Sequence, residues 1–156
     1  MQTNKREAQA PPAWAPWHLW PIGILGLLWN ALAALQYAMA QTRNRTYLAT
    51  AAEDMGIAPN ALLAYVDSFP PWVYAAWALG VFAGIAGSAL LLFRRERAVL
   101  AFALSLLGLV ITQVYHSVTP QPDWAQQAPG LTMALWGIAI ALLAYAHWLR
   151  RRELLR

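Results

Sequence analysis

The side chains best suited to chemistry in this 156-residue sequence are a few polar groups inside long apolar stretches. Thr112, Gln113 and His116 stand at the spacings of three and four residues that share one face of a helix. Because imidazole changes charge near neutral pH, these groups could line a polar cavity in which His116 binds a ligand together with a proton. The alternative is that His116 lies beside Tyr115 at a membrane boundary and is simply hydrogen-bonded.

Asn30 lies in the middle of another apolar stretch, and Ala34, Tyr37 and Gln41 continue its helical face. An amide without a partner costs several kcal/mol in hydrocarbon, so we expect Asn30 to face the protein interior. Two roles stay open for it: an interhelical hydrogen bond, with Ser105 as the expected partner, or a substrate contact. The predicted ligand-binding or cavity-lining side chains are Asn30, Gln36, Tyr37, Gln113 and His116.

A stripe of small residues indicates close helix packing between residues 72 and 93. Residues of this size at four-residue spacing leave a groove that another helix can approach closely. The partner is either a neighbouring helix of the same chain or, as the alternative, a second copy or a larger complex. The stripe consists of Ala76, Gly80, Gly84, Gly87 and Ser88.

Cofactor and enzyme chemistry find little support in the sequence. Cysteine is absent, which removes thiolate ligands and nucleophiles. His18 and His147 are the minimum for a bis-histidine haem, but both stand next to interfacial tryptophans instead of deep in a bundle. All seven acidic residues lie in tails or loops, and paired carboxylates and phosphate-binding glycine loops are missing. We therefore expect no metal, no cofactor and no catalytic activity.

The elements that position these residues are four apolar stretches without a charged residue. Each has about 20 residues, which as a helix crosses roughly 30 Å of hydrocarbon. The composition agrees, with 60% hydrophobic and 12% charged residues and a mean hydropathy of +0.40. Lipid offers no backbone hydrogen bonds, so helices are expected in place of a barrel. The predicted spans are Leu19–Ala40, Trp72–Phe93, Ala98–Val118 and Leu131–Leu149.

The distribution of basic residues predicts the orientation of these spans. Nine of the eleven Lys and Arg residues flank one side, and only Arg43 and Arg45 flank the other. Because basic loops stay in the cytoplasm, both termini are predicted to be cytoplasmic. The basic residues form short runs at the ends of apolar stretches, so the net charge of +4 does not indicate nucleic-acid binding. The expected location is a bacterial inner membrane, with the lipid bilayer as the first partner.

The predicted organisation is a single all-α membrane domain, residues 17–150, with an antiparallel four-helix bundle. Residues 1–16 and 151–156 form cytoplasmic tails. The periplasmic loop, residues 41–70, is expected to contain two helical pieces, Thr42–Met55 and Asn60–Val66, separated by Gly56 and Pro59. The end of the first span, Ala38-Met39-Ala40, also resembles a signal-peptide cleavage site, but its apolar region is longer than such peptides carry.

Several short motifs resemble a group of small four-helix bacterial inner-membrane proteins that are often labelled "sugar transporter". The resemblance covers roughly residues 16–118 and implies the four-helix topology and a bacterial setting, without naming a substrate. The stretch Ala51–Ala61 is longer than the group's pattern. The motifs are Pro16-Trp17-His18-Leu19-Trp20, Leu28-Trp29-Asn30-Ala31, Gln41-Thr42-Arg43-Asn44, Phe69-Pro70-Pro71-Trp72 and Ala76-Trp77-Ala78-Leu79-Gly80-Val81.

Two functions follow as hypotheses. The first is a non-enzymatic accessory or scaffolding subunit that packs through the glycine face of residues 72–93 and the outer loop, against itself or a larger membrane complex. The alternative is a small oligomeric transporter or channel for a polar solute, with a path lined by the predicted polar side chains. Four short apolar helices leave little room for an aqueous path, which favours packing.

Overall fold

The computed structural model describes residues 16–126 and 129–155, and this part of the chain is all-helical. Four of its helices are long and apolar enough to cross a membrane. Each begins and ends within two residues of a predicted span, which confirms four helices with the length and hydropathy of membrane spans. The predicted tail 1–16 lies outside the described residues except for Pro16. The four helices are α1 (Leu19–Gln41), α4 (Pro71–Leu92), α5 (Ala98–Val118) and α6 (Pro129–Arg151).

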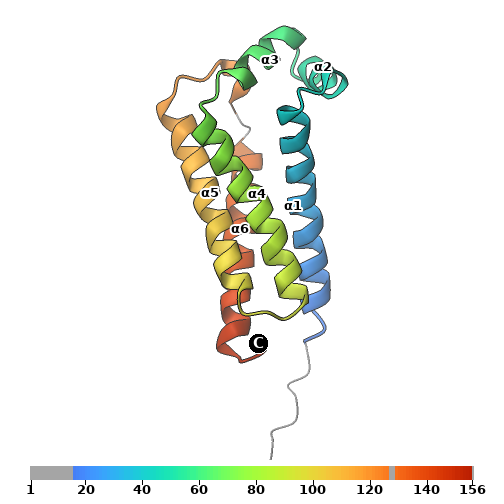
Figure 1. Cartoon of the computed structure of the whole chain (residues 1–156), viewed down its shortest axis with the longest axis vertical. Helices are drawn as coiled ribbons and strands as arrows, with labels where there is room; N and C mark the ends of the chain where they lie inside the picture. The colour runs from blue at the N-terminus through green and yellow to red at the C-terminus, as the bar shows by residue number, and fades with distance from the viewer. Residues whose placement is uncertain (1–15, 127–128, 156) are drawn as a thin grey trace, which may run out of the picture.

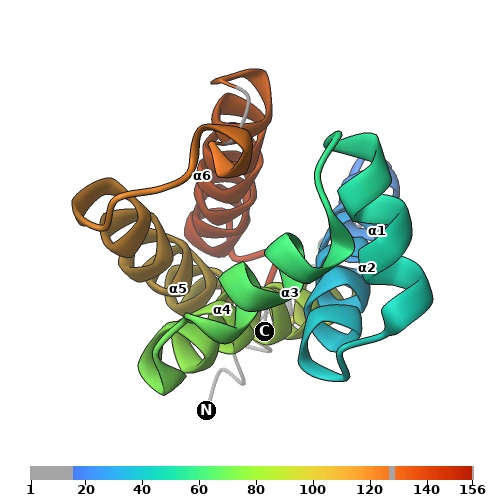
Figure 2. The same cartoon turned by 90° about the horizontal axis from the view of Figure 1, so that it is seen from above.

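The long helices stand side by side in the order α1, α4, α5, α6 around an incomplete ring (Figures 1 and 2). α4 is the central helix, because it packs along both α1 and α5. α6 packs mainly against α5, and the view from above shows it standing apart from α1 (Figure 2). The separation of α1 and α6 lies toward the cap end, because His18 and Gly26 of α1 contact Tyr145 and Leu142 of α6 nearer the arginine end.

Two short helices, α2 (Arg45–Asp54) and α3 (Pro59–Asp67), cover one end of the bundle, which we call the cap end (Figure 1). Both predicted helical pieces of this loop are present. The first begins three residues later than predicted, because Asn44 has an extended backbone and its side chain caps α2 by accepting a hydrogen bond of 3.0 Å from the Tyr47 N–H. Gly56, with φ at +67°, separates the two helices.

The cap has a hydrophobic core of its own. This core joins α2 and α3 to the ends of α1 and α4 and to Trp124, which lies in the short 3-10 helix η1 (Asp123–Ala125). Tyr74 of α4 donates a hydrogen bond to the carbonyl of Val66, and Arg43 and Asp67 form an exposed ion pair of 2.7 Å. The cap is thus fixed to the bundle by packing and by polar contacts. Its buried residues are Ala40, Leu48, Ala52, Leu62 and Val66.

The opposite end, which we call the arginine end, contains the turn between α4 and α5 and the residues that follow α6. A second hydrophobic core lies here and joins Leu19 of α1 to Leu91 of α4 and to Leu149 of α6. Leu155 is buried in the same core, and Arg94 donates from Nε to the carbonyl of Leu154 at 3.0 Å. The last described residues therefore fold back onto the α4–α5 turn.

Candidate functional site

Glycine allows a close contact between α4 and α5. A Cβ placed on Gly108 would lie 2.6 Å from the carbonyl oxygen of Ala76 and 2.7 Å from the Cα of Gly80. Real Cβ atoms essentially never come this close to backbone, so only glycine fits at position 108 without a shift. Part of the small-residue stripe of α4 therefore faces α5 of the same chain.

The next part of the stripe holds the amide of Asn30. A Cβ on Gly84 would lie 2.6 Å from Cγ of Asn30 and 3.1 Å from Oγ of Ser105, so α1, α4 and α5 meet at this glycine. Asn30 donates from Nδ2 to the carbonyl of Gly26 at 2.8 Å, and Ser105 donates to the carbonyl of Gly80 at 2.6 Å. In place of the predicted bond between Asn30 and Ser105, each side chain thus bonds a helix carbonyl.

The end of the stripe nearest the arginine end is also occupied within the chain. A Cβ on Gly87 would lie 2.8 Å from the Phe102 ring, and Ser88, which is fully buried, donates to the carbonyl of Gly84 at 3.0 Å. The Ser88 hydroxyl also lies close to Gly26 of α1. The whole stripe is therefore filled by α1 and α5, and a seam with a second molecule on this face would require their displacement.

Tyr37, one of the predicted cavity residues, packs between α1 and α4. Its ring stands edge-on to Trp77 and Phe82, with centroids 5.1 and 5.8 Å away. Its hydroxyl accepts a hydrogen bond of 2.9 Å from Nε2 of Gln41, one turn further along α1. Tyr37 therefore has a packing role in this structure.

His116 lies in an aromatic cluster at the cap end of α5. Its ring centroid is 5.6 Å from that of Phe69 and 5.5 Å from that of Tyr115. Thr112 donates back to the carbonyl of Gly108 at 2.8 Å. These contacts place His116 beside Tyr115, as in the second interpretation, and its role stays a prediction.

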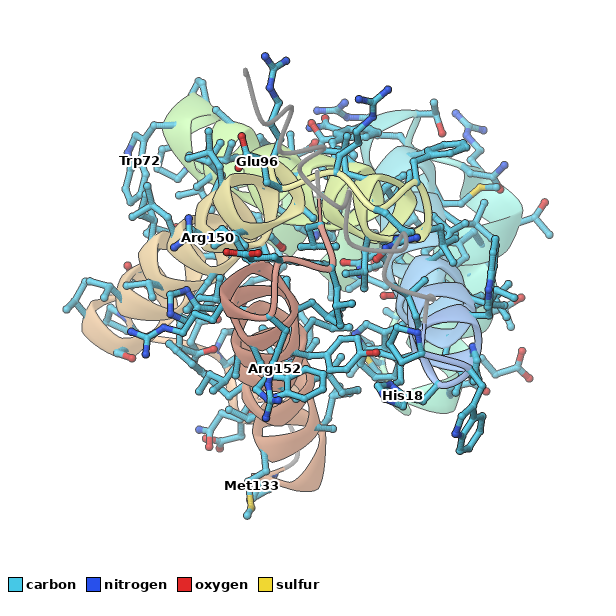
Figure 3. All side chains as sticks on the ribbon, turned by 90° about the horizontal axis from the view of Figure 1, so that it is seen from below. His18, Trp72, Glu96, Met133, Arg150 and Arg152 are labelled. Carbon is cyan, nitrogen blue, oxygen red and sulfur yellow. The ribbon has the colours of Figure 1, made fainter. Side chains whose placement is uncertain are left out.

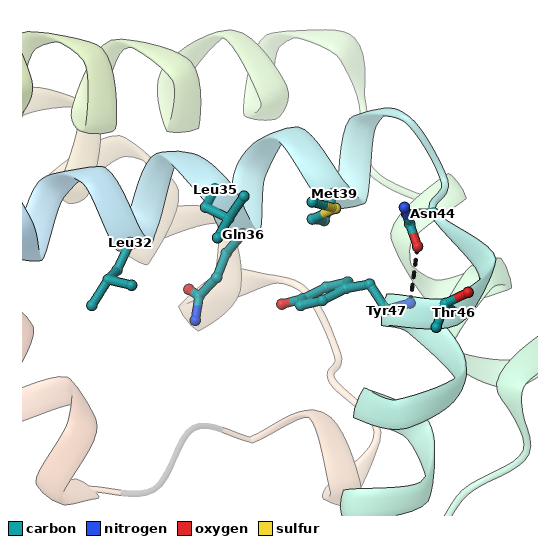
Figure 4. Close-up of a pocket in the computed structure, with 7 residues that line it drawn as sticks. All are labelled: Leu32, Leu35, Gln36, Met39, Asn44, Thr46 and Tyr47. Atoms are coloured by element: carbon teal, nitrogen blue, oxygen red, sulfur yellow. Dashed lines mark hydrogen bonds between the residues drawn. The ribbon is translucent and has the colours of Figure 1, made fainter.

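Gln36 lies on a different face of α1 from Tyr37. It is exposed and contributes to an open hollow of about 600 Å³ between α1 and the start of α2. Leu32 and Gln36 project from the side of α1 that is turned away from α4 (Figure 4). Asn30, Gln36 and Tyr37 thus have different surroundings, and Gln113 lies one turn from His116 on α5. The hollow is lined by Leu32, Leu35, Gln36, Met39, Asn44, Thr46 and Tyr47.

The two histidines considered for haem have different neighbours. Nδ1 of His18 is 2.6 Å from the Tyr145 hydroxyl, and this contact joins α1 to α6 at the arginine end. His147 contacts two arginines of its own helix, with Nε2 accepting from Nε of Arg151 at 2.9 Å and Nδ1 lying 3.3 Å from Nη2 of Arg150. Within residues 16–126 and 129–155, no three His, Asp or Glu side chains gather in a way that could hold a metal ion.

The first half of α6 contributes no buried residue to either hydrophobic core. None of residues 129–141 is buried, and Met133, at 74% exposed, points away from the other helices (Figure 3). A Cβ on Gly130 or Gly137 would meet no described atom within 4 Å. The sequence analysis missed this face, although one signal was available: small residues at spacings of four and three residues, which are Gly130, Ala134, Gly137 and Ala141.

The fold defines a class: an all-helical chain with four candidate membrane-spanning helices, compatible with a multi-pass membrane protein. Comparison with protein-family models, with curated proteins and with solved structures finds no match for this chain. The functional assignment therefore depends on the contacts described above.

Proposed function

We propose that this chain is a non-enzymatic, multi-pass protein of the bacterial inner membrane that acts as an accessory or scaffolding subunit. In this proposal the bundle is antiparallel, with the arginine end and both termini in the cytoplasm and the cap end in the periplasm. The charge asymmetry supports this orientation, because basic residues are retained on the cytoplasmic side.

The observation that carries the proposal is the open face of α6. A helix in a bundle normally buries one side, but none of residues 129–141 is fully buried, although Ile138 packs against the core at the arginine end. This face carries two glycines with open space above them, and transmembrane helices approach one another most closely at such positions. We therefore assign the first half of α6 as the surface that packs against a transmembrane helix of a second copy or of a larger complex.

The polar groups inside the helices support packing over transport. Asn30, Ser88 and Ser105 all donate to backbone carbonyls where helices contact one another. Hydroxyl and amide groups used in this way act as links between or along helices and do not face a solute. Because these polar groups have structural roles, we expect the function of the protein to depend on the external surface of the bundle.

The proposal is tested with glycine variants of the two stripes. Gly137→Leu fills the open face of α6, so it should abolish the higher-order complex after gentle detergent extraction while the isolated chain stays folded. Gly84→Leu, the comparison variant, places a large side chain against Asn30 and should destabilise the chain itself. An unchanged complex size in folded Gly137→Leu would overturn the assignment of the α6 face.

A second candidate is a small transporter or channel, which the hollow beside Gln36 favours. The hollow is open on the side of α1 away from α4, so a neighbouring copy would be needed to close it into a path. Solute uptake by proteoliposomes that falls in Gln36→Leu, with Ser117→Ala at an exposed position of α5 as the control, would support transport. The absence of uptake for any polar solute tested would remove this candidate.

A further inference from the structure

The turn between α4 and α5 contains a hollow with an unusual pairing of apolar and cationic walls. Leu90 and Phe93 form its apolar side, Arg94 and Arg95 form its cationic side, and its volume is about 460 Å³. Phe93 ends α4 and is 76% exposed, so an aromatic ring projects at the end of a candidate membrane-spanning helix. The hollow is thus built from Leu90 in the last turn of α4 and the three residues after this helix.

The backbone of the turn sets the direction of the two arginines. Arg94 has φ at +57°, a left-handed conformation that reverses the chain immediately after Phe93. Its Nε donates to the carbonyl of Leu154, which orients the guanidinium against the folded-back end of the chain. Arg95 is exposed next to it. The cationic wall is therefore part of a structured turn and does not belong to a loose tail.

The surrounding charge is strongly positive. Among the described residues, this end carries Arg97 and the run Arg150–Arg152, against Glu96 and Glu153. Figure 3 labels Glu96, Arg150 and Arg152. Arg152 also lies over the Trp148 ring, 5.3 Å from its centroid. The electrostatic potential at this end is therefore positive and attracts anions.

We propose that this hollow binds an anionic phospholipid of the membrane leaflet at the arginine end. Arg94 and Arg95 would contact the headgroup phosphate, and Phe93 and Leu90 would contact the first part of an acyl chain. Guanidinium groups form strong charge-assisted hydrogen bonds to phosphate oxygens, and basic pockets at the cytoplasmic ends of transmembrane helices fit anionic headgroups. A soluble phosphate would gain nothing from the exposed Phe93 ring, which is why we assign a lipid.

Native mass spectrometry of the full chain in detergent can test this site. Phosphatidylglycerol should bind in a defined stoichiometry and more tightly than phosphatidylcholine, and an excess of inorganic phosphate should not displace it. Arg95→Gln should weaken phosphatidylglycerol binding by about fivefold, and Phe93→Ala should weaken it as well. Arg45→Gln and Val118→Ala, which change an exposed arginine and an exposed apolar residue at the cap end, serve as matched controls and should bind as the parent does.

Each opposite result would overturn the lipid site. Equal binding of the two lipids, or unchanged binding in both Arg95→Gln and Phe93→Ala, would show that the hollow is not the site. Displacement by inorganic phosphate would assign it to a soluble anion. A thermal unfolding curve for each variant separates lost binding from lost folding, and the outcome does not depend on what packs against α6.

Discussion

Gly108 of α5 and Gly80 of α4 face each other, but only one of them needs to be glycine. A Cβ on Gly108 would lie 2.6 to 2.7 Å from α4 backbone atoms, among them the Cα of Gly80. A Cβ on Gly80 would keep 3.6 Å from the nearest atoms of α5, which is an ordinary van der Waals distance. The difference arises because the Cα–Cβ directions of the two residues are not equivalent at the crossing.

Alanine substitutions should reveal this asymmetry. Gly108→Ala should destabilise the chain by about 1–3 kcal/mol, because the backbones of α4 and α5 must separate to admit the methyl group. Gly80→Ala should change the stability by less than about 0.5 kcal/mol. Reversible unfolding in mixed micelles, followed by tryptophan fluorescence, measures both, and equal effects would contradict the crossing geometry.

Asn30 and Gly84 should show strong coupling. Gly84→Ala alone should be destabilising because its Cβ would collide with the Asn30 amide. In the double variant Asn30→Ala/Gly84→Ala the amide is gone, so the added methyl group gains room. A double-mutant cycle should therefore give a coupling energy of about 1 kcal/mol or more, with the double variant more stable than Gly84→Ala. Additive effects would mean that the two residues are not in contact.

Tyr145 should help to hold α6 against α1. Tyr145→Phe removes the hydroxyl that contacts His18 and should cost about 0.6 kcal/mol, the typical value for a hydrogen bond between membrane helices. It should also raise hydrogen exchange at the end of α6 nearest this contact. Tyr47→Phe, at the edge of the hollow beside Gln36, is the comparison variant. Identical stability and exchange in Tyr145→Phe and the parent chain would refute this role.

The stability of the cap should fall at alkaline pH because of Tyr65. Burial, with Tyr115 as a second cause, raises the pKa of Tyr65 above its usual value of 10.0, and its hydroxyl donates to Oε1 of Gln121. An unfolded tyrosine ionises first, so the stabilisation is present below pH 10 and is lost as the pH rises through the folded-state pKa. Tyr65→Phe should lessen the fall in unfolding temperature above about pH 10. An identical pH profile in the variant would contradict this assignment.

The four long helices were predictable from the sequence because a charge-free apolar run of about 20 residues has few other structural meanings. The start of α2 was not predictable, because it depends on the Asn44 side chain, which caps the helix. It also depends on Arg43, whose φ of +48° interrupts the helical conformation after α1. Hydropathy does not report such local hydrogen bonds. The prediction from the sequence also placed Thr42–Asn44 in this helix, whereas α2 begins at Arg45.

The candidate site was predicted less well, for a physical reason. In a membrane helix both the buried and the lipid-facing sides are apolar, so composition does not show which side packs. The stripe through Gly80 and Gly84 could therefore be recognised, and packing against the first or third span was one of its two interpretations, but the sequence did not exclude a second copy on the same face. The open stripe through Gly130 and Gly137 has similar spacing and becomes distinct only when the helices are placed.

Cross-linking from α6 in intact membranes tests the central claim most directly. The chain has no cysteine, so Met133→Cys can carry a single photoreactive maleimide on the open face, and Val114→Cys places the same group on an exposed position of α5. We predict one adduct of defined mass from position 133, which Gly137→Leu abolishes, and none from position 114. An adduct of twice the chain mass identifies a second copy, and another mass identifies a larger complex. No adduct from position 133, or equal adducts from both positions, would contradict the account.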